Sequence, residues 1–414
     1  MEKIQSAFSQ VDITPDYQVE LVGCDRNDRR SLGVLHHLYA QILLFQSEDD
    51  FYCLITIDSL GLTTELSNAL RAQVAKEFNT TVSHIMLNFS HTHSAPEPTP
   101  YALNGEKYCA YMFKQVLQGA INAKKFLKPC KIGWALTKTD IGENRRDGCT
   151  AVDDRLGALK IVDTQNGSTI AIALRVTAHA NVLMRENNFI SSDYFGVARN
   201  VLSNDFSCPI MMIQGAAGNI KPIGVHKIYG GSVSDLDIVV DRLRRSASKL
   251  SFEIEDITDI QMVSKSIEYV SYIPTKAEAE KIATNSGMDA SNWLLECERL
   301  RKADIEEQRQ KGEFQLLKIN AGCLCGVPEE IFCELAINAT KSSNNQLLFL
   351  NGYTNGCTGY LPTKVEWEKG GYETLYSYLS YYQFHGHVMP FYANTEEQIV
   401  ELVENTWMEL SRHQ

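Results

Sequence analysis

The sequence predicts an α/β protein: a single, layered αβα-type domain with a mixed β-sheet and a metal site at the C-terminal ends of its strands. Three observations lead to this prediction. Apolar strand patterns alternate with amphipathic helix patterns through most of the 414 residues, as they do in layered α/β domains. No repeat or low-complexity linker divides residues 1–414. Histidines follow the ends of two predicted strands, where open α/β sheets bind ligands.

Short apolar segments bounded by turn residues or charges predict the strands of the sheet. One of them delivers its C-terminal end to His91, and another ends at His179. A third is followed by a glycine-rich turn at 215–219. In chain order the predicted strands are 38–45, 51–58, 84–89, 131–136, 157–163, 169–178, 209–214, 315–325 and 346–351.

Apolar residues at helical spacing predict the helices. Thr63 or Thr64 can cap the first of them by accepting a hydrogen bond from a backbone N–H group. Further helices are expected at 235–250 and at about 396–410. Residues 275–312 are charged and helical in pattern, which predicts an exposed helical insertion or a lid.

Charge and composition argue against two classes of partner and indicate a compartment. The net charge is -12 and no basic block is present, so the chain lacks the face that nucleic acids require. No window reaches the roughly 18 consecutive apolar residues of a membrane span. The first six residues lack a signal-peptide pattern, and the scattered cysteines favour a reducing compartment. We therefore expect a cytoplasmic protein, with its oligomeric state left open.

The triplet His91–Thr92–His93 is the strongest local signal for chemistry. On an extended segment, residues i and i+2 face the same side, so both imidazoles can reach one pocket. Neutral imidazole is the commonest zinc ligand, and a catalytic zinc keeps one position open. The alternative is a pair of satisfied histidines at a strand end. A second pair, His385 and His387, lies in an aromatic loop and is a lid element, a ligand pair or neither.

Three further positions can complete a metal site if they converge with His91. His179 follows its strand directly, although a lone histidine there is more often a core or cap residue. Asp193 can orient a ligand imidazole or cap a helix. Glu329 and Glu330 follow a Gly-Val-Pro turn, where a carboxylate completes a His/His/Glu site or stabilises the N-terminus of a helix.

The order of these motifs resembles that of the catalytic domain of neutral/alkaline, non-lysosomal ceramidases over nearly the whole chain, from Val11 to about Leu410. The segment 90–96, Ser-His-Thr-His-Ser-Ala-Pro, is similar to the family's Thr-His-Thr-His-Ser-Gly-Pro block. Many blocks in one order are more specific than any single block. The other similar blocks are 11–15, 33–40, 57–61, 143–146, 178–180, 192–196, 326–332, 359–363 and 371–373.

The resemblance implies a zinc-dependent hydrolase that cleaves the amide bond of ceramide or a related N-acyl amine with metal-activated water. Its partner would be a small-molecule or lipid N-acyl substrate. The zinc ligands that the resemblance implies are His91, His179, Glu330 and Tyr360. The residues that it places around the reacting carbonyl are His93, Arg145 and Tyr372.

The chain departs from the family in two respects that bear on the substrate. In the glycine-rich turn, the family carries Ser before Gly-Asp, whereas this sequence has Gly215 and Asn219. Larger family members are secreted and have a C-terminal immunoglobulin-like domain, and we expect neither feature here. A smaller or more soluble N-acyl amine is therefore an alternative substrate.

Two other functions stay open. A different zinc amidohydrolase would act on a small soluble amide; TIM-barrel amidohydrolases also place two histidines after a strand, but eight regular βα units are not visible. A non-catalytic binding protein on the same scaffold is the other alternative, although a pure binding module has no need of the His, Glu and Tyr set.

Overall fold

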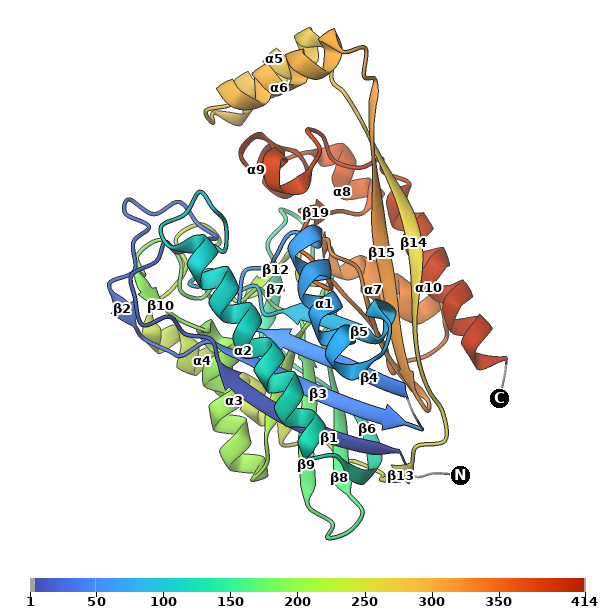
Figure 1. Cartoon of the computed structure of the whole chain (residues 1–414). Helices are drawn as coiled ribbons and strands as arrows, with labels where there is room; N and C mark the ends of the chain where they lie inside the picture. The colour runs from blue at the N-terminus through green and yellow to red at the C-terminus, as the bar shows by residue number, and fades with distance from the viewer. Residues whose placement is uncertain (1–3, 49, 413–414) are drawn as a thin grey trace.

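The computed structural model describes residues 4–48 and 50–412, and its largest element is a mixed sheet (Figure 1). The strand order is β11-β9-β8-β6-β1-β3-β4-β5, with β13 pairing on β6. Neighbours are antiparallel except β4–β5 and β9–β11, which are parallel. These strands are β1 (Gln5–Asp12), β3 (Tyr39–Ser47), β4 (Asp50–Ile57), β5 (Ile85–Phe89), β6 (Lys128–Lys138), β8 (Arg155–Asp163), β9 (Thr169–Val176), β11 (Ile210–Gln214) and β13 (Glu255–Asp256).

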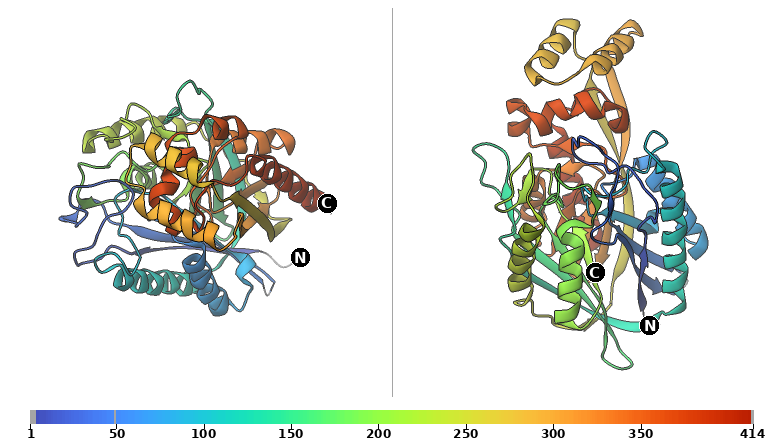
Figure 2. Two further views of the ribbon diagram at one scale, coloured as in Figure 1. Left: turned by 90° about the horizontal axis from the view of Figure 1, so that it is seen from above. Right: turned by 90° about the vertical axis from the view of Figure 1, so that its left-hand side faces the viewer.

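Helices cover the outer faces of this sheet in two pairs, seen on either side of the strands in the right-hand view of Figure 2. The pair α1 (Thr64–Phe78) and α2 (Gly105–Lys125) packs on β1, β3, β4 and β5. The pair α3 (Asp193–Phe206) and α4 (Val233–Ala247) packs on β8, β9 and β11. Each parallel strand pair is joined through one helix, as β4-α1-β5 and β9-α3-β11. The predicted α/β class with a mixed sheet is confirmed, and the TIM-barrel alternative is wrong.

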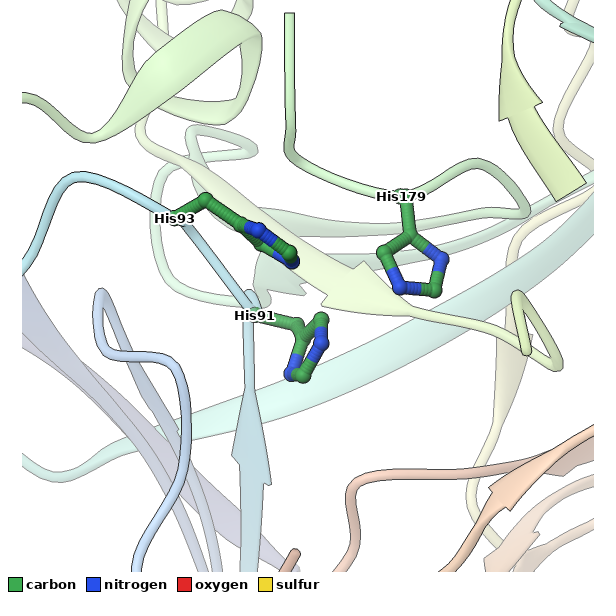
Figure 3. Close-up of side chains that lie close together, drawn as sticks. All are labelled: His91, His93 and His179. Atoms are coloured by element: carbon green, nitrogen blue, oxygen red, sulfur yellow. The ribbon is translucent and has the colours of Figure 1, made fainter. Parts of the chain in front are cut away.

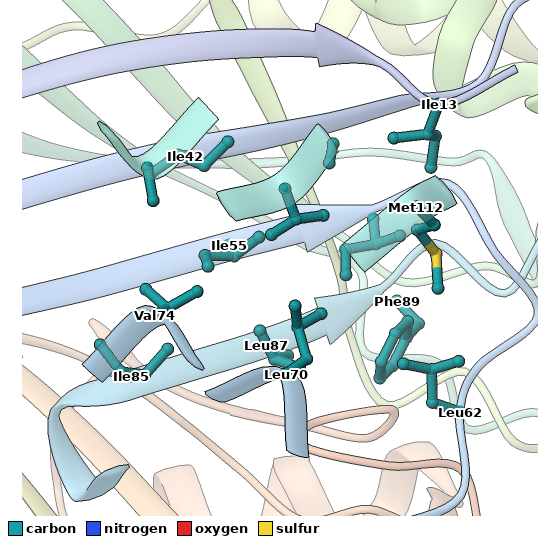
Figure 4. Packing of buried hydrophobic residues seen from close by; sticks show 14 of the residues in the cluster. Ile13, Ile42, Ile55, Leu62, Leu70, Val74, Ile85, Leu87, Phe89 and Met112 are labelled. Atoms are coloured by element: carbon teal, nitrogen blue, oxygen red, sulfur yellow. The ribbon is translucent and has the colours of Figure 1, made fainter. Parts of the chain in front are cut away.

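The β4-α1-β5 unit forms where the sequence predicts it. The Thr63 side chain caps α1 by accepting a hydrogen bond from the Leu66 backbone N–H at 3.2 Å. Leu70 and Val74 on α1 meet Ile55 and Leu87 on the strands (Figure 4). Burial of these side chains, each contributing about 1.5–3 kcal/mol, fixes the strand that leads to His91.

A second sheet lies beside the first and carries its own helices. Its order is β14-β15-β16-β18, and α7 (Cys333–Ser342) and α10 (Thr395–Ser411) pack on it. An apolar cluster that includes Leu54, Met211, Leu317 and Phe349 joins the two sheets. The strands are β14 (Ile260–Tyr272), β15 (Glu307–Ile319), β16 (Gly322–Gly326) and β18 (Leu348–Asn351).

The strands β14 and β15 extend beyond the sheet as an arm that ends in two helices (Figure 1). These are α5 (Lys276–Ser286) and α6 (Ser291–Lys302), which pack on α9 (Ser377–His385). The prediction of helices within 275–312 is therefore confirmed up to Lys302, but the residues from Glu307 onward belong to β15. The β15 residues 307–312 (Glu-Gln-Arg-Gln-Lys-Gly) include no apolar side chain, so no apolar alternation marks them as a strand. The function of this region as a lid stays a prediction.

The predicted strand 315–325 is a hairpin rather than one strand. β15 ends at Ile319, and Asn320 takes a left-handed conformation with φ 51° before β16 begins. Asparagine tolerates this conformation better than most residues. Within residues 4–48 and 50–412, no helix combines the length and the apolar character that crossing a membrane requires.

Asp153 forms a buried ionic cluster with two arginines that follow it in the chain. Its carboxylate lies 2.7 Å from Arg155 Nε and 2.8 Å from Arg175 Nη1. Burial raises the pKa of Asp153, but the two guanidinium groups outweigh it and hold that pKa below its usual value. The carboxylate is thus the counter-charge of two buried cations.

Replacing Asp153 with asparagine is expected to lower the free energy of unfolding by about 3–5 kcal/mol, because the buried guanidinium groups lose their counter-charge. The pKa of Asp153 is lower in the folded protein than in the unfolded chain, so its contribution is present above about pH 4 and is lost as the pH falls through the folded-state pKa. Urea unfolding at several pH values measures both effects. The matched control is Asp154→Asn, which removes an exposed pair with Lys138; equal losses in both variants would contradict the prediction.

Candidate metal centre

His91 lies two residues beyond the end of β5 and is locked in orientation by the backbone. Its φ is 61°, and its backbone N–H donates to the Ser59 carbonyl at 2.9 Å. Its Nδ1 lies 2.6 Å from the Leu60 carbonyl oxygen. Because a carbonyl can only accept, Nδ1 carries the proton, and in a neutral ring Nε2 is left as an acceptor.

His179 follows β9 and is fixed in the same way from the other parallel strand pair. Its Nδ1 lies 2.6 Å from the Ala217 carbonyl oxygen, and its side chain is fully buried. Burial is the main cause that lowers the pKa of His179 to about 4. The ring is therefore neutral at pH 7, with an acceptor lone pair on Nε2.

Glu330 meets both acceptor nitrogens. It begins β17 (Glu330–Ile331), which pairs in parallel with β19 (Tyr360–Leu361) so that Glu330 lies opposite Tyr360. Glu330 Oε2 is 3.2 Å from His91 Nε2 and 3.3 Å from His179 Nε2. Burial raises the pKa of Glu330, but the adjacent histidines outweigh it and hold that pKa well below its usual range.

This arrangement fits a divalent metal ion. In a neutral His179 ring, an acceptor nitrogen faces a carboxylate oxygen at 3.3 Å, and Nε2 has no hydrogen-bond partner within the described residues. Two acceptors at this distance repel each other unless a metal ion or a proton lies between them. The edge of a tetrahedron with zinc–ligand bonds of about 2.0–2.2 Å is about 3.3–3.5 Å. The two distances to Glu330 match that edge, and the donors are the imidazole and carboxylate groups that zinc prefers.

His93 faces the same cluster as His91 and His179 (Figure 3). The His93 ring centroid lies 5.0 Å from that of His91 and 5.6 Å from that of His179. Candidate ligand nitrogens of the three rings lie within 4.8 Å of one another. Neither ring nitrogen of His93 has a hydrogen-bond partner within the described residues, and burial lowers the pKa of His93 well below its usual value. A third nitrogen donor is therefore available to a metal or to a substrate.

Gly23 supports the His93 ring and is expected to tolerate no side chain. Its φ is 107°, and a Cβ atom there would lie 2.8 Å from His93 Cγ. We expect Gly23→Ala to lower the free energy of unfolding by roughly 1–3 kcal/mol through backbone strain, with a further loss from displacement of His93. Thermal unfolding measures the change. Gly148→Ala isolates the backbone component, because its φ is 78° and no atom lies within 4 Å of the added Cβ; equal losses would show that the contact with His93 carries no cost.

The Arg145 guanidinium group contacts the Tyr360 side chain. Its Nη2 donates to the Tyr360 hydroxyl at 3.0 Å and to the Gly218 carbonyl at 2.6 Å. Its Nε lies 3.0 Å from Glu373. Burial raises the pKa of Tyr360 well above its usual value, and Arg145 opposes that rise. Tyr372 begins a one-turn π-helix, is 44% exposed, and its ring centroid lies 6.3 Å from that of Tyr360.

Asp193 does not orient an imidazole, so that alternative is wrong. Its carboxylate accepts from the backbone N–H groups of Leu183 and Tyr194, each at 2.8 Å. Backbone carbonyls orient His91 and His179 instead, and a sequence motif does not reveal a carbonyl contact. His385 and His387 lie against Tyr378, with ring centroids 5.1 Å away in each case.

Two residues of the centre were missed from the sequence. The Tyr353 ring packs 4.5 Å from the His91 ring, and Cys357 Sγ lies 3.9 Å from His91 Nδ1. Candidate ligand atoms of Cys357, His91 and Glu330 lie within 4.8 Å of one another, so the thiol is a further group that could reach a metal ion here. The Gly- and Asn-rich composition of residues 351–360 indicates a functional loop, but nothing in that pattern distinguishes these two positions.

Comparisons with known proteins give structural matches only. No family model matches the sequence, and no curated protein matches it. The crystal structure of neutral ceramidase from Pseudomonas aeruginosa matches with a TM-score of 0.73 and 15% sequence identity, over 98% of this chain and 75% of that chain. A ceramidase complexed with C2 matches with a TM-score of 0.73 and 14% identity, over 99% of this chain and 76% of that chain. The histidine–glutamate cluster is thus held in a protein that has the neutral ceramidase fold.

Proposed function

We propose that this chain is a zinc-dependent hydrolase that cleaves the amide bond of ceramide or a related N-acyl amine. The observation that carries the proposal is the meeting of the His91 and His179 Nε2 atoms at one oxygen of Glu330, within a ceramidase fold. A binding protein has no need of two desolvated imidazoles that face a carboxylate.

His91, His179, Glu330 and Tyr360 would hold the zinc. When bound, zinc supplies a Lewis acid for the amide carbonyl and lowers the pKa of water toward neutrality. The chain holds its donors ready for the ion, because the Leu60 and Ala217 carbonyls fix the tautomers of the two imidazoles. Arg145 donates to the Tyr360 hydroxyl oxygen, which favours the phenolate form that a metal ligand needs.

Tyr372 and His93 are the residues that we expect to act on the substrate. Tyr372 is partly exposed beside Tyr360 and can donate its hydroxyl proton to the oxygen of a tetrahedral intermediate. His93 has two ring nitrogens without partners within the described residues, so it can stabilise the same oxygen or carry a proton to the leaving amine. Arg145 donates to the Tyr360 hydroxyl, so it can also act on the centre through Tyr360.

The turn at Gly215 bears on the choice of substrate. A Cβ atom at Gly215 would lie 2.5 Å from Thr177 Oγ1 and 2.7 Å from the Arg175 guanidinium carbon, so no serine fits there with the present neighbours. The chain therefore has no serine hydroxyl at this point that could contact the substrate. This favours a test that varies the head group as well as the acyl chain.

A panel of N-acyl substrates tests the proposal. Ceramides and simpler N-acyl amines of varied head group and chain length are incubated with zinc-loaded protein, and the released fatty acid is measured. We expect cleavage of at least one member, its loss on chelation, and its return when zinc is restored. Protein that carries about one zinc per chain and cleaves no member would contradict the hydrolase proposal, and ligand binding that survives complete chelation would favour the binding protein.

A further inference from the structure

A second tyrosine, Tyr353, touches the carboxylate at the centre of the cluster. Its hydroxyl lies 3.4 Å from Glu330 Oε2, the oxygen that both histidines face. The side chain is completely buried. Its ring packs tilted against His91 at 4.5 Å and edge-on to His179 at 6.1 Å. Tyr353 therefore contacts all three of the groups that meet at this point.

Tyr353 has a strained backbone conformation, which hydrogen bonds of its backbone retain. Its φ is 54°, a left-handed conformation that is strained for a bulky residue. Its carbonyl accepts from the Phe89 N–H at 3.0 Å, and its own N–H donates to the Glu329 carbonyl at 3.2 Å. The residue thus ties the end of β5, which leads to His91, to the segment that carries Glu330. Strain that is retained by such surroundings is typical of functional sites.

The two tyrosines of the centre have opposite hydrogen-bonding roles. The Tyr360 oxygen accepts from Arg145, whereas the Tyr353 hydroxyl faces an ionised carboxylate, which can only accept. Tyr353 is therefore the donor. A ligand carboxylate held by a hydrogen bond keeps the orientation in which it binds metal, and the loss of such an outer partner weakens metal affinity by about 10–100-fold.

We propose that Tyr353 is a positioning residue of the metal centre, whose hydroxyl holds the Glu330 carboxylate in place for a divalent cation. The inference rests on the proposed zinc site, but it concerns affinity for the ion and needs no knowledge of the substrate. It also separates the roles of the two tyrosines: Tyr360 is a ligand, and Tyr353 acts through Glu330.

Zinc affinity of the metal-free protein provides the test. The dissociation constant is measured by competition with a chromophoric chelator for the wild type, Tyr353→Phe and Tyr269→Phe. Phenylalanine keeps the ring that packs on His91, so only the hydroxyl is lost. Tyr269 is the matched control, because it is also fully buried and its hydroxyl donates to a buried carboxylate, Glu329, at 2.9 Å.

We expect Tyr353→Phe to raise the zinc dissociation constant by about 10–100-fold, and Tyr269→Phe to leave it within about twofold although it loses a comparable hydrogen bond. In the Glu330→Ala background, Tyr353→Phe should add less than about a twofold change, because the acceptor through which it acts is gone. This second comparison tests whether the effect of Tyr353→Phe on zinc affinity passes through Glu330.

Two results would overturn the inference while leaving the zinc site intact: an unchanged dissociation constant in Tyr353→Phe, or equal weakening in Tyr353→Phe and Tyr269→Phe. Failure of the proposed zinc site has a different signature, since the wild type itself would then bind no zinc, and failure of the hydrolase proposal shows in the substrate panel rather than in this dissociation constant. Circular dichroism of each metal-free protein establishes that the variants compared are folded.

Discussion

The variant His179→Ala is expected to lose both its metal and its amidase activity. The side chain is fully buried, and its Nε2 is one of the two nitrogens that meet at Glu330. Removing it leaves too few donors for the four-coordinate site that zinc prefers. The zinc content should fall from about one ion per chain to a small fraction of that value. Hydrolysis should fall by about 10³-fold or more, which corresponds to the several kcal/mol that a Lewis acid contributes.

Elemental analysis and the substrate panel measure these two quantities in the same preparation. The matched control is His387→Ala, which removes another buried histidine whose Nδ1 faces a backbone carbonyl, that of Met389 at 2.6 Å. This variant is expected to be less stable but to retain its zinc. Full zinc content in His179→Ala, or equal loss in both variants, would remove His179 from the ligand set.

For His93→Ala, we expect a fall in kcat of about 10²–10³-fold, the usual effect of removing one group that stabilises an oxyanion, with unchanged zinc content. The expectation follows from a ring that faces His91 and His179 and has two nitrogens without partners within the described part of the chain. Such a ring can contact the substrate while the four proposed ligands, His91, His179, Glu330 and Tyr360, hold the ion.

The same geometry also fits His93 as a metal ligand, and the zinc content of His93→Ala distinguishes the two roles. Candidate nitrogens of His91, His93 and His179 lie within 4.8 Å of one another, so His93 can instead be a third nitrogen ligand. In that case the variant would lose zinc together with activity. Zinc loss in His93→Ala would therefore move His93 from the substrate side of the centre to the ligand set.

The parts of the fold that the sequence predicts are those that rest on local patterns. The strand ends at His91 and His179 follow from short apolar segments that finish in polar residues, and the Thr63 cap follows from its position before an apolar stripe. These features depend on neighbours in the chain, so one sequence is enough to find them.

Other features depend on contacts between distant segments. Residues 307–312 of β15 include no apolar side chain that would mark a strand, and β1, β14 and α2 were not predicted at all. The contacts of Tyr353 with Phe89 at the end of β5 and with Glu330 form only when these distant segments are brought together. The carbonyls of Leu60 and Ala217 act as orienting groups, which no pattern of side chains can reveal.

The distribution of the donors along the polypeptide has a consequence for biosynthesis. His91 and His179 leave the ribosome well before Glu330 and Tyr360, which follow His179 by 151 residues or more. Contacts between segments so far apart form late. A nascent chain therefore exposes its two imidazoles before Glu330 can join them, and the proposed donor set is complete only after Tyr360 has been synthesised.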